Sequence, residues 1–559
     1  MPTTFSPHVT HVKNDPLDHL GDFTTTTRVL PIAGLAVVIG VAAAYVAAGL
    51  LKLISFFTNL FFFQQFSTAQ VSPAANHLGP LVILVPVAGA IVIGLMARYG
   101  SDRIRGHGIP EAIEAILMGG SRVEPKVALL KPVSAAISIG SGGPFGAEGP
   151  IIMTGGALGS MAAQLFHLTA TERKTLLVAG AAAGMSATFA APVASVVLAV
   201  ELLLFEWKPR SVIPVALAAV AAAAMRRHIL GLGPLFAVAP HPAFIGWEGL
   251  AGCVVVGLLA GALSAILTGA VYAAEDTFQR LPIHWMWWPA IGGLIIGLGG
   301  FVFPQALGVG YDVIDRLLQA DPPMRLIAGV LLVKSLIWAL SLGSGTSGGV
   351  LAPLLMMGAA LGGLEATMLP AEGAGFWPLV SMGAILGGTM RAPLTGVVFA
   401  LELTHDVNML LPLLLAVTIA HGFTVLTLRR SILTEKISRR GYHLSREYST
   451  DPLEIIFARE VAREVDALVA GEASAHGVFA YADEPLRMVA YRMAETGVTR
   501  LPVVSRQDGT PLGIIELSDL LTARSRILEA EQRRERLLGT RAQLRAIAAM
   551  FGGDRRRTT

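Results

Sequence analysis

Long apolar runs separated by short glycine- and proline-rich turns make up the chain between residues 29 and 428. The first run, residues 29–63, exceeds the roughly 20 residues that cross a bilayer as a helix, so we expect it to tilt or overhang. Further apolar helices are predicted at residues 78–96, 126–138, 150–166, 174–189, 192–204, 212–230, 250–274, 286–303, 326–342, 353–368, 377–390, 393–401 and 409–428. Several are too short to span a membrane alone, and such interrupted half-helices are typical of a transporter or channel core.

The composition indicates a membrane protein that crosses the bilayer several times. Of the 559 residues, 53% are hydrophobic and 14% are charged, whereas soluble proteins usually carry about 25% charged residues. Residues 1–28 are polar, with Asp15 and Asp18 where a cleavable signal would need a basic start and an apolar core. We therefore expect a cytoplasmic N-terminal segment there. The single cysteine, Cys253, excludes an intrachain disulfide.

The chain contains an internal duplication. With a shift of 203 positions, twelve residues of the first half fall on identical residues of the second half, among them Lys131 on Lys334 and Pro150 on Pro353. With a shift of 201, Glu201 falls on Glu402. Two copies are therefore predicted, at about residues 78–230 and 286–428, and duplicated transporters commonly hold their substrate where the copies meet. This pattern does not decide whether the copies are parallel or inverted.

A carboxylate stands in the most glycine-rich part of the first copy. Residues 140–150 contain seven glycines and prolines together with Glu148. A helix starting at Pro150 would direct the preceding amides out of its N-terminus, and such amides form an anion site. A lone carboxylate at membrane depth is costly and is a candidate functional group, although a glycine-rich packing site is the competing interpretation. The second copy has Leu351 at the matching position, which favours a function needed once.

Three spaced motifs give the pattern a family resemblance. Residues 106–110 (Gly-His-Gly-Ile-Pro), 146–150 (Gly-Ala-Glu-Gly-Pro) and 349–353 (Gly-Val-Leu-Ala-Pro) resemble, in order, the pore signatures of the CLC family of chloride channels and transporters. The resemblance covers about residues 30–440. It implies an all-α, inverted-repeat membrane domain over residues 29–440 and a homodimer with one pore per subunit. Chloride or a similar small anion would be held by helix N-termini rather than by fixed cations.

The resemblance implies roles for individual positions. Glu148 matches the family's gating glutamate, which competes with the anion and swings aside when protonated, and Lys131 matches a basic residue near the pore. The residues expected to bind the anion are His107, Gly108, Ile109, Gly146, Ala147, Gly149, Val350, Leu351 and Leu433.

Three of these positions depart from the family pattern. His107 stands where the family usually has Ser. Its imidazole either replaces the hydroxyl as a donor with pH-dependent charge or turns away toward neighbouring carbonyls. Leu351 replaces a Phe, and Leu433, in a segment that resembles the final pore helix, replaces a Tyr hydroxyl. Anion binding would then depend on the amides of Val350 and Leu351 and on His107, and the preferred anion stays open.

Proton coupling is the next question. Family exchangers commonly carry an internal glutamate just after the position of Glu201, and this chain has Leu202 there, as many family channels have an apolar residue. Because Glu201 recurs as Glu402, we interpret it as structural. The sequence therefore favours a chloride channel, with chloride/proton exchange as the alternative.

The last part of the chain has the character of a soluble domain. Six basic residues between Arg429 and Arg446 follow the last apolar run and predict a cytoplasmic C-terminus. We expect a linker at residues 441–476, a domain at 477–528 and a basic tail at 529–559. The domain resembles a single CBS domain, marked by residues 499–504 (Thr-Arg-Leu-Pro-Val-Val) and 512–521 (Leu-Gly-Ile-Ile-Glu-Leu-Ser-Asp-Leu-Leu).

In CBS domains, the residues matching Ser518 and Asp519 often contact the ribose of an adenine nucleotide, and a purely structural dimerisation module is the alternative. Apart from that nucleotide, no cofactor or metal is expected, and no nucleic acid is expected as a partner. We expect the protein in a bacterial-type inner membrane.

Two other classes fit less well. A CBS-regulated cation channel, for example for magnesium, would need carboxylates along its pore, and Glu148 is the one acidic residue in the pore motifs. An intramembrane enzyme would need a metal-binding HExxH, a GxSxG or paired aspartates at a suitable depth, and the sequence has none of these there.

Overall fold

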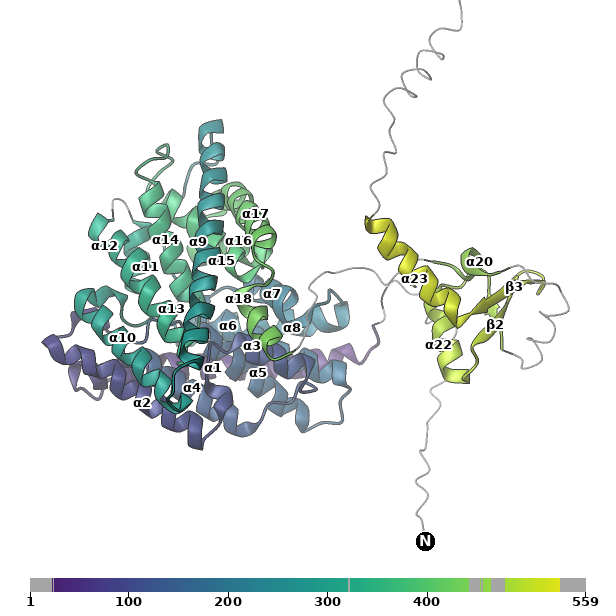
Figure 1. Cartoon of the computed structure of the whole chain (residues 1–559), viewed down its shortest axis with the longest axis horizontal. Helices are drawn as coiled ribbons and strands as arrows, with labels where there is room; N and C mark the ends of the chain where they lie inside the picture. Colours follow the sequence, from purple (N-terminus) through teal and green to yellow (C-terminus); the bar gives the residue numbers. More distant parts are fainter. Residues whose placement is uncertain are drawn as a thin grey trace, which may run out of the picture. The chain divides into compact units, whose positions relative to one another are not determined.

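The computed structural model describes residues 23, 25–319, 322–441, 453, 456–463 and 478–532. The chain divides into two compact units, Met1–Arg446 and Glu447–Thr559, and each is described by itself (Figure 1). Most of the predicted N-terminal segment, linker and basic tail lies outside the described residues.

The first half of unit 1, which contains the predicted first copy at about residues 78–230, has these elements in order: α1 (Val29–Thr58), continued by η2 (Asn59–Phe63), η3 (Pro73–Ala75), η4 (Gly79–Ile83), α2 (Leu84–Tyr99), η5 (Asp102–Ile104), α3 (Ile109–Leu117), α4 (Pro125–Gly140), α5 (Glu148–Gln164), α6 (Ala170–Phe189), α7 (Pro192–Leu198), continued by η6 (Ala199–Leu204), and α8 (Pro209–Ile229).

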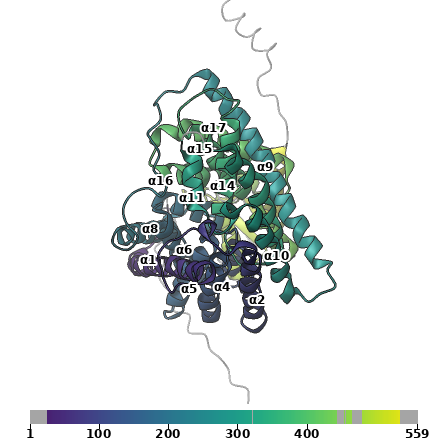
Figure 2. The same ribbon diagram turned by 90° about the vertical axis from the view of Figure 1, so that its left-hand side faces the viewer.

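The second half of unit 1, which contains the predicted second copy at about residues 286–428, has these elements in order: α9 (Trp247–Gln279), η7 (Trp285–Trp287), α10 (Trp288–Val302), η8 (Pro304–Ala306), α11 (Tyr311–Leu318), α12 (Met324–Ala328), continued by η9 (Gly329–Lys334) into α13 (Ser335–Gly343), α14 (Leu351–Glu365), α15 (Phe376–Met390), α16 (Pro393–Thr404), η10 (Val407–Met409), α17 (Leu410–Thr427) and α18 (Ile432–Arg439). Figure 2 shows the purple and blue helices of the first half gathered on one side of unit 1 and most green helices of the second half on the other.

Seven helical segments of the described residues are long and apolar enough to cross a membrane. They are Val29–Phe63, Gly79–Tyr99, Pro209–Ile229, Trp247–Gln279, Trp285–Val302, Met324–Gly343 and Val407–Arg439. The apolar helices around the motifs are shorter, for example α14 and α16. Their ends therefore lie inside the bundle, where helix termini are tolerated because protein rather than lipid surrounds them.

Equivalent residues of the two copies contact each other reciprocally. Gly146 and its counterpart Gly349 form an antiparallel bridge, in which the amide of each donates to the carbonyl of the other at 3.0 and 2.8 Å. The carboxylate of Glu201 accepts from the first amides of α16, and that of Glu402 accepts from the first amides of α7. Contacts of the form i to j and j to i are what a two-fold axis produces. The copies are therefore related by an internal two-fold.

Unit 2 contains a three-stranded sheet with the order β1-β2-β3. β1 (Ala480–Tyr481) pairs in parallel with β2 (Arg500–Val504), which pairs antiparallel with β3 (Pro511–Glu516). The chain also contains α20 (Ala458–Val461), α22 (Leu486–Thr496) and α23 (Leu517–Gln532). Apolar residues of the strands and helices bury one another in a core of their own.

Candidate functional site

The starts of α5 and α14 lie against each other at the Gly146–Gly349 bridge. α5 begins at Glu148, two residues before the predicted start at Pro150, and α14 begins at Leu351. The expectation that Pro150 opens the helix is therefore wrong. A proline at the third position is equally tolerated, because none of the first four amides of a helix has a partner inside it.

Backbone atoms of all three motifs approach closely at this point. A Cβ atom on Gly149 would overlap the carbonyl oxygen of His107, and a Cβ atom on Gly349 would lie 2.6 Å from Oε2 of Glu148 and 2.7 Å from the Gly146 carbonyl oxygen. Gly108, at φ +90°, lies against the backbone of Gly149 in turn. Glycine is required here because any side chain would force the three helix starts apart.

The Glu148 carboxylate occupies the N-terminus of α14. Its side chain is fully buried, with 0% exposed, and Oε1 accepts a hydrogen bond from the amide of Ala352 at 3.2 Å. Oε2 has no hydrogen-bond partner among the described residues. The carboxylate thus lies where a helix start binds a negative charge, in the manner that a bound anion would.

Two of the amides expected to face an anion are engaged elsewhere. Gly146 donates to the Gly349 carbonyl at 3.0 Å, and Gly108 donates to Oε2 of Glu111, which caps α3, at 2.8 Å. These two amides are therefore not available to an anion. Ala352, which sequence reasoning missed, supplies an amide in their place.

His107 lies between this junction and a cavity. Its side chain is 4% exposed, and its Nδ1 has no hydrogen-bond partner among the residues that the structure describes. The alternative in which neighbouring carbonyls satisfy the imidazole is therefore not observed for Nδ1. A buried, unpartnered ring nitrogen is costly unless it meets a ligand or water.

Lys131 and its counterpart Lys334 hold equivalent turns. The Lys131 ammonium, fully buried, donates to the carbonyls of Ile104 and Gly106, both at 2.8 Å. Lys334 donates to the carbonyls of Ala306 and Gly308 at 2.9 and 2.7 Å. Lys131 thus bonds the residue that precedes His107 and is directed at the backbone that leads into α3.

A cavity of ≈ 380 Å³, here called the α18 vestibule, opens beside His107. Its lining includes Asp102, Arg105, Gly106, His107, Val271, Tyr272, Glu275, Gln279, Trp285, Trp288, Leu342, Gly343, Gly345, Lys436, Arg439 and Arg440. Leu433 is buried in α18 and is not among these residues, whereas Tyr272 of α9 lines the cavity and donates to the carbonyl of Ile432. A tyrosine hydroxyl therefore reaches the start of α18 from another helix.

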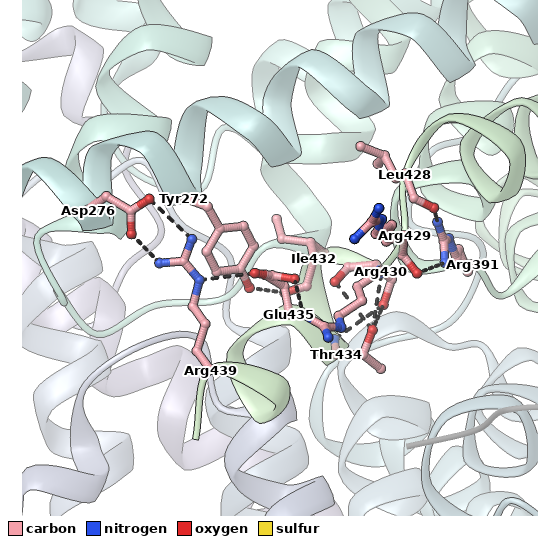
Figure 3. Close-up of polar contacts among 11 residues, drawn as sticks. Tyr272, Asp276, Arg391, Leu428, Arg429, Arg430, Ile432, Thr434, Glu435 and Arg439 are labelled. Atoms are coloured by element: carbon pink, nitrogen blue, oxygen red, sulfur yellow. Dashed lines mark hydrogen bonds and ion pairs between the residues drawn. The ribbon is translucent and has the colours of Figure 1, made fainter. Parts of the chain in front are cut away.

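Ion pairs fix α18 to its surroundings. Figure 3 shows Arg439 reaching Asp276 on one side and Glu435 on the other, with Tyr272 pointing toward the carbonyl of Ile432. In the same view, Arg391 donates to carbonyls at the end of α17, including that of Leu428. These contacts hold α18 as one wall of the vestibule.

Glu201 and Glu402, which lie outside the junction, serve as helix caps. Glu201 accepts from the amides of Leu394 and Thr395 at 3.1 and 2.9 Å, and Glu402 accepts from those of Val193 and Ala194 at 3.0 and 2.7 Å. This geometry agrees with a structural role for Glu201. Leu202 is fully buried, with 0% exposed, so the neighbouring position offers no carboxylate.

Asp519 also has partners within its own unit. Its Oδ2 accepts from the amide of Glu516 at 2.9 Å and its Oδ1 pairs with Arg463. The Ser518 hydroxyl is exposed and lies 3.4 Å from Oε2 of Glu516. Nucleotide binding by Ser518 and Asp519 stays a prediction.

Comparison with known proteins identifies the family. Residues 88–425, more than half of the chain, match the voltage-gated chloride channel family. The chain belongs to this family, the CLC family. Residues 471–526 match the CBS domain, which confirms the small C-terminal α/β domain of this CLC protein.

Named relatives of this CLC protein are described as a chloride channel protein and as an exchange transporter. It is 32% identical over 345 residues to a protein of Ralstonia nicotianae described as "Putative chloride channel protein ClcB-like", covering 60% of this chain and 80% of the relative. It is 30% identical over 407 residues to the H⁺/Cl⁻ exchange transporter ClcA of Salmonella schwarzengrund, covering 69% of this chain and 84% of the relative. Anion transport across a membrane is therefore the activity of its family.

Solved CLC structures share the fold. A slow cyanobacterial Cl⁻/H⁺ antiporter matches with a TM-score of 0.65 and 23% identity over 73% of this chain and 97% of that one. A eukaryotic CLC transporter matches with a TM-score of 0.61 and 18% identity over 88% of this chain and 98% of that one. The predicted CLC-type helical membrane domain is confirmed.

Proposed function

We propose that this CLC protein is a chloride channel in which Glu148 is the gate. The observation that carries the proposal is the hydrogen bond from the Ala352 amide to Oε1 of Glu148, which places a carboxylate at the N-terminus of α14. A chloride ion competes for the same amide. When Glu148 is protonated it loses its charge, so the α14 N-terminus then favours the chloride over the side chain.

Neutral donors suit a conducting site. The amides at the starts of α5 and α14, together with His107, attract an anion through partial charges. The buried cation Lys131 is directed at two carbonyls. Binding is therefore strong enough for chloride to enter and weak enough for it to leave, as conduction requires. The same arrangement disfavours the cation-channel alternative, because helix N-termini repel cations.

A channel is preferred to an exchanger because position 202, directly after the Glu201 cap, is a leucine and not a second carboxylate. Position 202 is a buried leucine, and both oxygens of Glu201 accept hydrogen bonds from α16. The Glu201 carboxylate thus serves as a helix cap at the start of α16.

Chloride/proton exchange is the second candidate. It is favoured by the description of the Salmonella relative as an H⁺/Cl⁻ exchange transporter, whereas the Ralstonia relative is described as a chloride channel protein. Under this alternative, protons reach Glu148 by a route that does not use an acid at position 202.

The test is chloride efflux from liposomes that hold the purified protein, with proton movement recorded at the same time. A channel gives chloride efflux without proton movement, and an exchanger drives protons uphill as chloride leaves. Glu148→Ala should remove the pH dependence of chloride flux in either case, and Glu402→Gln, which alters the cap of α7 outside the junction, serves as the carboxylate control. If chloride flux through Glu148→Ala still depends on pH, Glu148 is excluded as the gate.

We further propose that the protein is a homodimer in a bacterial-type inner membrane, with the α18 vestibule facing the cytoplasm. The family resemblance supports the dimer, and the basic residues around α18 support the orientation. In liposomes, protection of a cysteine introduced at exposed Met118 from an external thiol reagent would test the orientation.

A further inference from the structure

Glu365, the last residue of α14, is a buried carboxylate that the proposed gate does not use. Its side chain is 4% exposed, and both of its oxygens lack a hydrogen-bond partner among the described residues. With the shift of 203 positions, its counterpart in the first copy is Ala162, so the duplicated fold does not require a carboxylate here. Because a buried polar group without a partner is costly, Glu365 points to a ligand.

Glu365 lies on the face of α14 that packs against α15. Gly358 and Gly362 precede it at helical spacing, which places all three residues on one side of the helix. A Cβ atom on Gly362 would overlap the carbonyl oxygen of Trp377, and one on Gly358 would lie 2.7 Å from Cα of Met382. The backbones of α14 and α15 are thus in direct contact along this face, and the Glu365 side chain belongs to that contact.

Ser381 of α15 is the polar side chain that interacts with the Glu365 carboxylate. Ser381 is fully buried, and its Oγ also has no hydrogen-bond partner among the described residues. An ionised carboxylate can only accept a hydrogen bond, whereas a serine hydroxyl can donate and accept. A proton on Glu365 makes the carboxyl group a donor to Oγ of Ser381, and the serine hydrogen is then free to donate to a carbonyl of its own helix.

No cation in the described part of the chain balances a charge on Glu365. On the elements packed against α14, the cations are Arg316 of α11, Arg325 of α12 and Lys334 of η9. Arg316 and Arg325 are exposed, and Lys334 donates to two backbone carbonyls. None of the three pairs with Glu365. The acidic residues of the same elements would only repel a further negative charge, and they are Glu148, Glu248, Glu275, Asp276, Asp312 and Asp315.

The ligand that fits this site is a proton. Ca²⁺ and Mg²⁺ take about six or more oxygen ligands. Glu365 and Ser381 supply only their side-chain oxygens, and the backbone carbonyl of Glu365 already accepts from the amides of Met368 and Leu369. The described residues also contain no group of three His, Cys, Asp or Glu side chains that could hold a metal ion. A proton needs only one carboxylate oxygen and one acceptor, and both are present.

We propose that Glu365 is a proton-binding site of the membrane domain, in which the carboxyl group keeps its proton at neutral pH and donates to Oγ of Ser381 across the α14–α15 contact. Loss of that proton leaves an unpaired charge between two closely packed helices. The charge also stands at the C-terminus of α14, where the helix macrodipole disfavours it. The proton therefore holds α15 against the helix whose other end carries the Ala352 amide. This site is independent of Glu148 and of chloride transport.

Denaturant unfolding of the full-length protein in detergent tests whether the folded state holds this proton. A glutamate in the unfolded chain ionises above about pH 4.3, so a proton kept in the folded state makes folding less favourable as pH rises. Glutamine does not ionise. Relative to the unmodified protein, Glu365→Gln should therefore gain about 10-fold in its ratio of folded to unfolded protein per pH unit between about pH 5 and pH 7.

Glu372→Gln is the matched control for the unfolding experiment. Glu372 lies in the loop that follows α14 and is partly exposed. Its carboxylate is ionised in the folded and the unfolded protein over this pH range, so the stability of Glu372→Gln relative to the unmodified protein should not change with pH.

Infrared spectroscopy detects the bound proton directly, because a protonated carboxyl group has a carbonyl stretch that an ionised carboxylate and a glutamine lack. At neutral pH, Glu365→Gln should lose part of this band, and Glu372→Gln should show it as the unmodified protein does. Ser381→Ala removes the acceptor and should shift the band to higher frequency without removing it. If Glu365→Gln elutes as aggregate, Ser381→Ala carries the test.

Three results would overturn the proposal. The first is a stability of Glu365→Gln, relative to the unmodified protein, that stays constant between about pH 5 and pH 7. The second is an infrared band that neither Glu365→Gln nor Ser381→Ala alters. The third is stabilisation of the unmodified protein, but not of Glu365→Gln, by sodium chloride over choline chloride at equal ionic strength, because the site would then hold a metal cation.

Discussion

Replacing Glu201 with glutamine tests whether this residue is a structural helix cap or a proton carrier. The Glu201 carboxylate accepts from the amides of Leu394 and Thr395 at 3.1 and 2.9 Å and from the Thr395 hydroxyl at 2.6 Å. In Glu201→Gln, one oxygen becomes an NH₂ group that faces a donor, and the charge at the start of α16 is lost. Glu402→Gln makes the same change at the start of α7, where two amides donate to the carboxylate.

The magnitude follows from these bonds. A hydrogen bond to a charged group contributes about 1.5–3 kcal/mol, against about 0.5–1.5 kcal/mol for a neutral one. Losing one hydrogen bond and the charge behind the others should lower the free energy of unfolding by about 2–3 kcal/mol in Glu201→Gln, and partial exposure of the side chain reduces this loss. At Glu402, which lacks the hydroxyl donor, about 2 kcal/mol is expected. Both variants should therefore unfold at a lower temperature than the unmodified protein, with Glu201→Gln the more affected.

The assay combines thermal unfolding in detergent with chloride and proton recording in liposomes. Both variants should leave proton movement as it is in the unmodified protein and should reduce only the amount of folded protein. The reasoning is refuted if Glu201→Gln changes proton movement while Glu402→Gln, at similar stability, does not. That result would make Glu201 part of a proton route.

Three further variants test single features of the fold. Gly149→Ala should abolish chloride flux and lower the unfolding temperature, because the added Cβ has no space. Gly422→Ala is the control and should do neither, because nothing lies within 4 Å of its added Cβ. Normal flux and stability in Gly149→Ala would contradict the close approach of the helix starts. Lys131→Met and Lys334→Met each remove two hydrogen bonds to carbonyls. Each should lower the free energy of unfolding by a similar amount, about 2–4 kcal/mol, measured by thermal unfolding. Unequal losses would contradict equivalent structural roles and would indicate that Lys131 acts mainly on the pore. Asp519→Ala should speed limited proteolysis of the C-terminal unit in the full-length protein, and an unchanged rate would show that its cap contributes little.

Much of the membrane domain is predictable from the sequence because its determinants are local or repeated. Apolar runs predicted helices close to their observed bounds; α15, for example, spans Phe376–Met390, against the predicted 377–390. The duplication was visible because Lys131 and Lys334 must hold the same turn in both copies. The start of α5 was misplaced because proline is as acceptable at its third residue as at its first.

The details of the site depend on contacts between distant segments, which a single sequence does not reveal. That Gly146 pairs with Gly349, and so withdraws its amide from the anion, follows from the two-fold contact and not from either motif. The Ala352 amide and the pairing of Arg105 with Trp285 likewise arise from residues more than 100 positions apart that meet in the fold. No local pattern marks such positions.

The central claim is that chloride binds where the Glu148 carboxylate now lies, at the N-terminus of α14. Crystals of Glu148→Ala grown in bromide test it directly, since bromide replaces chloride and is located by its anomalous scattering. The account predicts a bromide peak within contact of the Ala352 amide, at the position that Oε1 of Glu148 occupies in the unmodified protein. Strong bromide peaks elsewhere in the bundle, with none beside Ala352, would contradict it.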